Sequence, residues 1–524
     1  MAAATGPRVD NIQGNSFGGF NKDFQSLSFL QFTDRDAGRA WVATMARELA
    51  TSEEVMAFNV LFKRLMARRG GELGLLKVTW ANLAFTHSGL EALGVSAADL
   101  AGFPQAFRDG MKKRAAQIGD IGDSDPKHWV GRLGSKHVHA VLIVASDAQS
   151  DLHQQVSRYT QNIMANGTIN LIFAQEGAVR SDQPGHEHFG FKDGVSQPGV
   201  RGIDAPDDPV SNPDQGHPGQ DLLHPGEFVL GYPTQIPHLD PAKPDASPNP
   251  TPGPISQSGP AWTVDGSYLV FRRLRQHVLA FHDYVAAQAK HQGLTSDQMG
   301  AKLVGRWASG APLEKRKDEP AGPFVLPPID PGTTDPTLPG DDSRNNNFEY
   351  GGDAEPDNDP EGFIVPRAAH IRKTYPRDET TPVPVAADSE SATQTHRLLR
   401  RGIPFGTSFR PTLGAASHGS DGVFPRDRGL LFLCYQTDLE RQFEFVQNTW
   451  VNNVNFPKPG DGQDPILAQR DAHRTFTLPK GPGTQPAHLK LMTHFVVTTG
   501  GDYFFQPSIA AVAGLGKPLS GSGP

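Results

Sequence analysis

The sequence predicts an α+β protein made of two ferredoxin-like domains with antiparallel sheets, peripheral helices and long loop insertions. In the first 200 residues, segments with strand and helix patterns follow in the order strand, helix, strand, strand, helix, strand, which is the order of a ferredoxin-like unit. A second set of strands and helices begins after residue 260. We therefore expect an N-terminal domain over 1–200 and a C-terminal domain over 201–524.

The elements of the first half follow from the spacing of their apolar residues. Residues 26–33 alternate between apolar and polar side chains, as a half-buried strand does. Residues 37–69 have apolar side chains at intervals of three and four with few helix breakers, which predicts one helix. Further strands are expected over 77–86, 137–145 and 168–175, and further helices over 104–117 and 147–165.

The second half repeats this alternation between stretches rich in loop-forming residues. Strands are expected over 268–274, 429–436, 491–498 and 502–505, and helices over 276–291, 295–307 and 438–450. Prolines and glycines dominate 202–260, where only 226–232 has an ordered pattern, and 312–359 is rich in Pro, Asp and Asn. Both stretches are predicted to be long loops.

Composition limits the classes of function. With 37% apolar and 20% charged residues, 45 prolines and 56 glycines, the chain is typical of a globular protein with irregular loops. A net charge of −8 argues against nucleic acid or an anionic membrane surface as the main partner. The single cysteine, Cys434, excludes an intrachain disulfide. Without a secretory signal pattern or an apolar run near the roughly 20 residues that span a bilayer, we expect a cytoplasmic protein, with a removed leader as the alternative. A homo-oligomer is left open.

The first candidate for chemistry is Asp193, which lies between Gly190 and Gly194 and close to Phe189 and Phe191. Glycine permits a close backbone approach and a positive φ, so an acidic side chain on such a turn points into whatever the turn covers. The plain alternative is a surface turn in which Asp bonds to its own backbone. The two phenylalanines, which favour burial, argue for a covered site instead.

Two basic segments follow downstream. His370 comes after two alanines, which leave room for a large flat group, and is followed by the basic residues Arg372, Lys373 and Arg377. A haem iron commonly takes a histidine ligand, and basic side chains pair well with haem propionates. Further on, Arg400 directly precedes Arg401 and the turn 402–406, so the two arginines are expected to point to different sides.

Together these stretches resemble the dye-decolourising peroxidases. The motif Gly-x-x-Asp-Gly is present at 190–194, the proximal His segment at 368–373 and the distal Arg segment at 400–406. Similar stretches also occur at 11–15, 20–24, 226–232, 442–447 and 500–505, so the resemblance covers nearly the whole chain. Each motif alone is weak, but their shared order and spacing make the resemblance specific.

The resemblance implies haem b in the C-terminal domain with His370 as axial ligand, and Asp193 and Arg400 on the distal side as catalytic residues. It also implies six further cofactor contacts, of which the first three lie along the haem, the fourth lies near a propionate and the last two, on one face of a strand, lie in the distal wall. These residues are Gly194, Val195 and Ser196, then Arg377, and then Leu430 and Phe432.

The predicted function is a peroxidase that reduces hydrogen peroxide and oxidises small-molecule electron donors such as dyes and phenolics in one-electron steps. Mn²⁺ is a further candidate donor, because acidic residues around Asp341 and Asp359 are able to hold a hard cation, although a solvated acidic loop is the plainer interpretation. Two alternatives remain: a haem carrier or iron-release protein without peroxidase turnover, and a non-haem module that binds Ca²⁺. The Ca²⁺ alternative is not supported, because the sequence near Asp193 has no Asp-rich loop with a terminal Glu.

Overall fold

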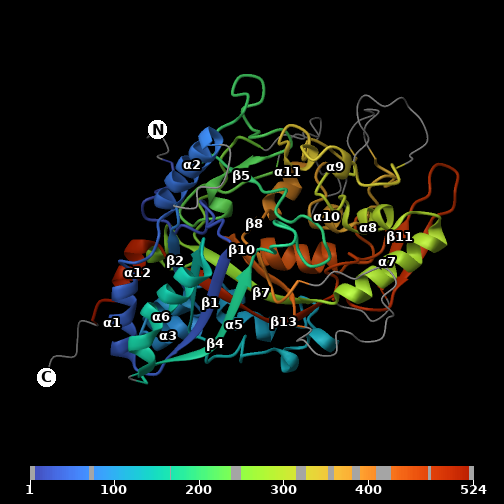
Figure 1. Ribbon diagram of the computed structural model, residues 1–524. Coiled ribbons are helices and arrows are strands. Elements are labelled where there is room, and N and C mark those ends of the chain that lie inside the picture. Colours follow the sequence, from blue (N-terminus) through green and yellow to red (C-terminus); the bar gives the residue numbers. More distant parts are fainter. Residues whose placement is uncertain are drawn as a thin grey trace.

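The structure is a computed structural model that describes residues 6–69, 76–165, 167–237, 249–313, 326–351, 359–379, 390–408, 427–469 and 474–518. A nine-stranded sheet forms its centre, with strand order β4-β1-β3-β2-β13-β7-β10-β8 and β9 paired to β10 (Figure 1). Its strands are β1 (Phe24–Phe32), β2 (Thr79–Phe85), β3 (Ala140–Ser146), β4 (Ile169–Ala178), β7 (Ser267–Gln276), β8 (Leu399–Arg400), β9 (Ile403–Phe405), β10 (Gly429–Gln436) and β13 (Val496–Gln506).

The pairings within this sheet are antiparallel, which confirms the predicted α+β class with antiparallel strands. The two predicted sets of strands join into one sheet where Phe505 of β13 pairs with Phe85 of β2. The far edges of the sheet also approach each other. Gly177 of β4 lies so close to Ile403 of β9 that a Cβ added to the glycine would be 2.6 Å from the Ile403 side chain. The sheet is therefore curled like a barrel, in keeping with the right-handed twist of strands.

Helices cover the outside of the sheet. In Figure 1, α1, α3, α6 and α12 gather at one end of the molecule, while α7, α8 and α10 lie at the other end, nearer the second-half strands. The helices are α1 (Arg35–Met45), α2 (Ser52–Arg69), α3 (His87–Ala92), α4 (Ala97–Ala101), α5 (Gln105–Arg114), α6 (Gln149–Ala165), α7 (Val278–Gln292), α8 (Ser296–Val304), α9 (Pro331–Thr334), α10 (His370–Thr374), α11 (Glu390–Thr393) and α12 (Ile509–Leu515).

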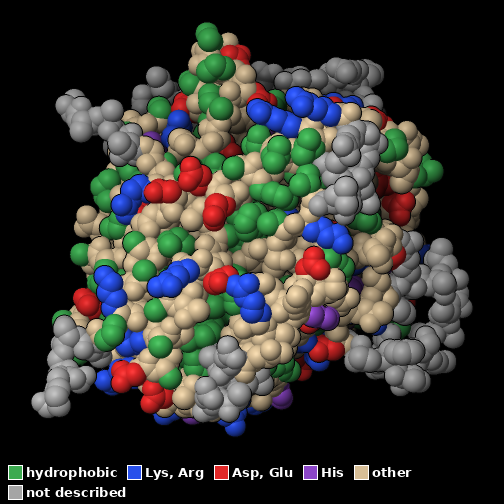
Figure 2. Space-filling view, turned by 60° about the vertical axis from the view of Figure 1, so that its left-hand side comes forward, with side chains coloured by type: hydrophobic (Ala, Val, Ile, Leu, Met, Phe, Trp, Pro, Cys, Tyr) green, Lys and Arg blue, Asp and Glu red, His purple; other side chains and the backbone are tan. Residues whose placement is uncertain are grey.

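Smaller elements complete the chain. They are two short strand pairs, β5 (Gly199–Val200) with β6 (Leu222–Leu223) and β11 (Arg474–Leu478) with β12 (Ala487–Leu491). On the face shown in Figure 2, acidic and basic side chains are interspersed. Among the described helices, none is both long and apolar enough to cross a bilayer.

The single helix predicted over 37–69 is wrong, because the chain leaves the helix at 46–51. Main-chain groups there bond to other segments: the Ala50 amide donates to the Ala81 carbonyl at 3.0 Å, and the Ser52 amide to the Ile12 carbonyl at 2.7 Å. The second helix then restarts with a reciprocal cap, in which the Thr51 amide donates to Glu54 at 2.8 Å and the Glu54 amide to the Thr51 hydroxyl at 3.1 Å. Thr-x-x-Glu is a known helix-start signal, so the sequence does contain the information.

Two predictions near the C-terminus also need correction. The strands expected over 491–498 and 502–505 are one strand, β13, whose pairing with β7 shifts register between Thr498 and Gly501. The helix expected over 438–450 is present but has the wider turns of a π-helix over Glu440–Glu444 and Val446–Val451. Such widened turns are uncommon and frequently accompany functional sites.

Candidate active site

All nine predicted site residues line one large cavity. It contains roughly 1760 Å³ of space free of protein atoms, including the part that opens to solvent. The predicted residues on its wall are Asp193, Gly194, Val195, Ser196, His370, Arg377, Arg400, Leu430 and Phe432. Much of the remaining wall is apolar, and it includes Leu274 of β7, Val496 of β13 and side chains of the π-helical segment. The cavity therefore suits a large, mostly apolar ligand with a few polar contacts.

The loop before Asp193 is held in shape by its glycines and a buried aromatic pair. Gly190 and Gly194 have φ values of +96° and +75°, a region that residues with a Cβ rarely adopt. Phe189 is buried and stacks on Phe281 of α7 with ring centroids 4.4 Å apart, a contact worth about 0.5–1.5 kcal/mol beyond the area it buries. The Asp193 side chain accepts a hydrogen bond from the Gly194 amide at 2.7 Å.

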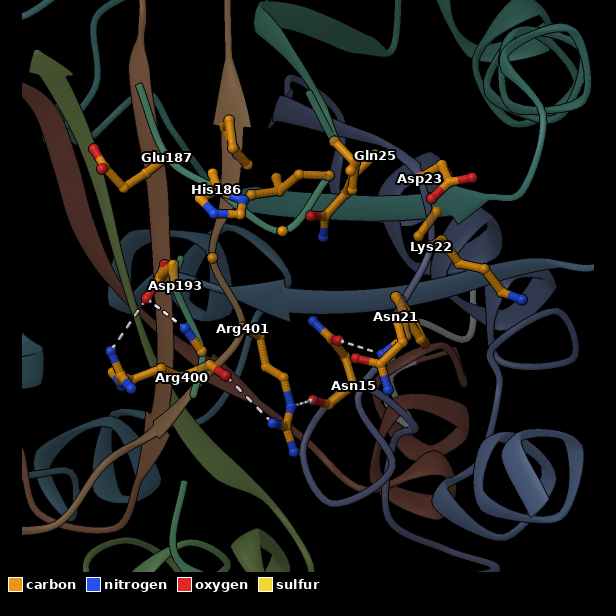
Figure 3. A pocket seen from close by; sticks show the side chains of 18 of the residues that line it. Asn15, Asn21, Lys22, Asp23, Gln25, His186, Glu187, Asp193, Arg400 and Arg401 are labelled. Carbon is orange, nitrogen blue, oxygen red and sulfur yellow. Dashed lines mark hydrogen bonds and ion pairs between the residues drawn. The ribbon is translucent and has the colours of Figure 1, made fainter. Parts of the chain in front are cut away.

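Arg400 lies beside Asp193 at the cavity. Its Nη1 is 3.5 Å from Asp193 Oδ1 (Figure 3). Its Nη2 donates to the Ser196 carbonyl at 2.7 Å. The Gln197 side chain bonds to the Arg400 backbone in both directions, at 3.2 and 3.1 Å. The carboxylate and the guanidinium thus come from different segments, and Gln197 ties those segments together.

Arg401 has a different environment from its neighbour, because successive residues of a strand point to opposite faces. Its guanidinium donates to the Asn15 carbonyl at 3.1 Å (Figure 3). It also donates to the carbonyls of Ser16 at 2.7 Å and Phe17 at 3.1 Å. Burial lowers the pKa of Arg401 to about 10. Its role is to tie the N-terminal loop to the sheet.

His370 begins α10 and is oriented by a buried carboxylate. Its Nδ1 is 2.8 Å from Asp464 Oδ2, and the other carboxylate oxygen of Asp464 accepts the amides of Ile466 at 2.7 Å and Leu467 at 2.9 Å. Burial alone would raise the pKa of Asp464, but His370 and these amides together lower it. An ionised Asp464 accepts a hydrogen bond from Nδ1–H of His370, and the unprotonated Nε2 is then free to bind a metal.

Asp464 is a site residue that the sequence does not reveal. It lies 94 residues after His370, in a stretch with no recognisable spacing to it. A metal-binding histidine commonly has an acceptor for its second nitrogen, but the sequence around 464 does not identify that acceptor.

The basic residues after His370 serve different purposes. Arg372 is fully buried and pairs with Glu379 at 2.8 and 3.0 Å, and Lys373 donates to backbone carbonyls that include Asn453 at 2.7 Å. Of the three basic residues that follow His370, only Arg377 lines the cavity. Arg372 and Lys373 instead anchor α10, and burial lowers the pKa of Lys373 to about 7.

The cavity has a cationic wall formed by Arg306, Arg377 and Arg397. Arg397 is paired with Asp221 at 2.6 Å, whereas Arg377 forms no ion pair within the described residues. Arg377 Nη1 donates to the carbonyls of Asn346 at 3.1 Å and Phe348 at 2.9 Å, which fixes its position.

Tyr350 and His396 also line this cavity, and among the described residues the buried Tyr350 hydroxyl and His396 Nε2 have no hydrogen-bond partner. Buried polar atoms normally have partners, so these two atoms indicate a ligand that carries polar groups. A free Nε2 on His370, apolar walls, an arginine that has no ion pair among the described residues and two polar atoms without partners among them together fit the haem that the sequence predicts, with its iron, its flat ring and its propionates.

A second, polar cavity of roughly 1130 Å³, including the part that opens to solvent, adjoins the first one. Its outer wall includes Asn21, Lys22, Gln25 and His186 (Figure 3). Residues that line both cavities form the partition between them, and these are Glu187, Asp193, Gly194, Arg400 and Gly402.

The acidic loops offer no cation site in the part of the chain that the structure describes. The Asp341 carboxylate accepts from Ser343 and Arg344, at 2.5 and 2.6 Å for their side chains. The Asp359 carboxylate accepts the amides of Phe363, Ile364 and Val365. Three further acidic residues of this stretch, at 353, 355 and 357, lie outside the described residues.

Comparison with known families matches both halves of the chain. Residues 11–181 match the DyP dimeric alpha+beta barrel domain, and residues 243–456 match the Dyp-type peroxidase C-terminal domain.

Individual relatives agree over almost the full length. A dye-decolorizing peroxidase of Mycetinis scorodonius is 31% identical, covering 98% of this chain and 88% of its own. A multifunctional dye peroxidase of an Amycolatopsis species is 28% identical, covering 97% of this chain and 96% of its own. By contrast, a deferrochelatase of Yersinia pestis matches only 36% of this chain and 28% of its own, at 30% identity.

Solved structures agree as well. An ancestral D-type dye-decolorizing peroxidase superposes with a TM-score of 0.76 at 32% identity, covering 98% of this chain and 100% of that one. A fungal DyP-type peroxidase from Auricularia auricula-judae gives a TM-score of 0.73 at 29% identity, with the same coverage.

Proposed function

This chain belongs to the dye-decolorizing peroxidase family, whose members are haem enzymes, and from that premise we propose that it holds haem b in the large cavity. The protein is a peroxidase that acts on hydrogen peroxide and oxidises dyes. In this proposal His370 is the iron ligand, Asp193 and Arg400 act on the peroxide, and Arg377 binds a propionate. The domain over 201–524 holds the haem, and the domain over 1–200 supplies Asp193.

One observation carries the proposal: His370 lines the same cavity as the Asp193–Arg400 pair. A metal ligand, a carboxylate and a permanent cation on one apolar cavity are the groups that peroxide cleavage needs. The supporting features are the Asp464 contact that leaves Nε2 of His370 free, and the flat apolar wall that includes Leu430 and Phe432.

The chemistry of the two distal residues follows from their charges. Cleaving the O–O bond of hydrogen peroxide requires moving a proton from one oxygen to the other, and Asp193 is placed to accept and return it. Negative charge develops on the departing oxygen, and Arg400, which stays cationic, stabilises it. When bound, the haem supplies the electrons for this cleavage. The Ser196 carbonyl holds the Arg400 guanidinium and Gln197 holds the Arg400 backbone, so little reorganisation is required at the moment of reaction.

The proposal is tested with purified protein loaded with haem. We expect a Soret band on haem addition, and rapid mixing with hydrogen peroxide should change the haem spectrum before any donor is added. Adding a phenolic donor should then return the original spectrum. A haem carrier or iron-release protein would bind haem but would show no rapid, donor-reversible change, and that outcome would contradict the proposal.

The neighbouring arginines provide a matched pair of variants. Arg400→Leu should slow the reaction with peroxide at least tenfold, on the order of the 10²–10³-fold seen when one charge-stabilising donor is removed. Arg401→Leu should leave that rate close to the wild-type value, because its guanidinium binds the carbonyls of 15–17 instead. It should lower the melting temperature, since three buried carbonyls lose their donor. If stopped-flow mixing shows a slow Arg401→Leu and a normal Arg400→Leu, Arg401 rather than Arg400 acts on the peroxide.

A further inference from the structure

Glu187 is the second carboxylate in the partition between the two cavities. It lies six residues before Asp193 in the same loop, and Figure 3 shows both on the wall of the polar cavity. Both residues also line the large cavity. The peroxide chemistry described above does not use it. The contacts of its side chain indicate a different purpose.

Both oxygens of the Glu187 carboxylate accept hydrogen bonds, three in all. Oε2 accepts the amide of Phe189 and Oε1 accepts the amide of Phe191, both at 2.8 Å. The side-chain amide of Gln276, on β7, also donates to Oε2. One side chain therefore binds two amides of its own loop and fastens that loop to the central sheet.

Backbone contacts place Asp193 at the end of this clamped turn. The Glu187 amide donates to the Phe191 carbonyl at 3.0 Å, and the Gly190 amide donates to the Glu187 carbonyl at 3.0 Å. The Asp193 amide donates to the Gly185 carbonyl at 2.9 Å, which closes the turn. The position of the Asp193 side chain thus depends on the shape of 185–193.

We propose that Glu187 is a positioning residue for the peroxide reaction, and that its ionised carboxylate holds Asp193 in place by clamping the loop to β7. This inference rests on the proposed role of Asp193. Backbone amides only donate, so both carboxylate oxygens have to be acceptors. An ionised carboxylate meets this need with charge-assisted bonds about twice as strong as neutral ones. A glutamine would turn its NH₂ group toward one of the donating amides.

The clamp should depend on pH. Burial raises the pKa of Glu187 to about 7, with the charge of Asp193 adding to the rise and the three hydrogen bonds opposing it. Other charged or titratable groups near Glu187 include its neighbours His186 and His188, Arg180, which donates to its carbonyl at 2.5 Å, and Lys192 and Arg400 on the cavity walls.

The sign of the effect follows from that pKa. The folded protein binds the proton of the Glu187 carboxyl more tightly than the unfolded chain does. Proton uptake therefore stabilises the fold fully below about pH 4.5, and this stabilisation is lost as pH rises through 7. The carboxylate clamp has the opposite dependence: it is complete above pH 7 and weakens as pH falls through 7.

Hydrogen exchange over 185–193 in the haem-loaded enzyme tests the clamp directly. After correction for intrinsic exchange, wild-type protection of these amides should fall as pH decreases through about 7. Glu187→Gln should give low protection that does not vary with pH. Glu176→Gln is the control, because Glu176 is an exposed carboxylate on β4 that pairs with His153 and does not contact the loop. Wild-type protection in Glu187→Gln would overturn the proposal.

A double-mutant cycle tests whether the clamp acts through Asp193. Glu187→Gln should slow the peroxide reaction by about ten- to a hundredfold, since small misplacements of a reacting group cost up to roughly 10²-fold. In the Asp193→Asn background, Glu187→Gln should cause no further loss, whereas a merely structural role would reduce the rate in both backgrounds. If Glu187→Gln loads haem poorly, Gln276→Ala, which leaves both amide contacts intact, should show the same non-additivity with a smaller loss. Additive losses of rate would contradict the proposal. A wild-type rate in Asp193→Asn would refute the role of Asp193, but the hydrogen-exchange result would still test the clamp.

Discussion

His370→Ala is expected to abolish stable haem binding and with it the peroxidase activity. His370 is the only residue on the cavity wall that we assign as an iron ligand, and its Nδ1 is already bound to Asp464 at 2.8 Å. The fold should survive, because α10 is held by Arg372 and Lys373 rather than by His370. The Soret band after haem addition and gel filtration measures the loss, and the melting temperature of the apoprotein serves as the control.

Two further variants make this test more specific. Imidazole added to His370→Ala should restore part of the Soret band, because the deleted ring leaves space for it. Asp464→Asn should keep His370 but weaken haem binding by about 10–100-fold, as loss of such a supporting carboxylate typically does. A full wild-type Soret band and full activity in His370→Ala would show that the iron ligand is another residue.

Asp193→Asn should lower the rate of reaction with peroxide by roughly 10²–10⁴-fold while haem content stays normal. General acid–base catalysis is typically worth that factor, and Asn is unable to take up and return a proton. The loop should keep its shape, because the amide oxygen of Asn can still accept from the Gly194 amide, as Asp193 does at 2.7 Å. The variant therefore separates loss of the base from loss of the turn.

Stopped-flow mixing of the haem-loaded variant with hydrogen peroxide gives the rate. Donor oxidation, measured separately from the oxidised enzyme, should change little, because Asp193 is assigned only to the peroxide step. If Asp193→Asn reacts with peroxide at the wild-type rate, Asp193 is a turn residue, and Arg400 with solvent carries the proton step.

Local sequence patterns were sufficient for the class of fold and for the order of the three motifs. Apolar periodicity predicted β1, β3, β7 and β10 to within a few residues because side-chain alternation is a property of the strand itself. The glycines around Asp193 have the positive φ that their positions suggested. The alternation of strand neighbours also separated Arg400 from Arg401.

Only the tertiary structure decided how these local pieces combine. The halves share one sheet because Phe505 pairs with Phe85, a contact between strands more than 400 residues apart. The basic residues after His370 look alike in sequence, yet Arg372 is neutralised by Glu379 while Arg377 remains available at the cavity. Asp464 and Gln276 join the site through the packing of distant segments. Spacing along the chain determines what a residue does locally, whereas its partners depend on which surfaces the folded sheet brings together.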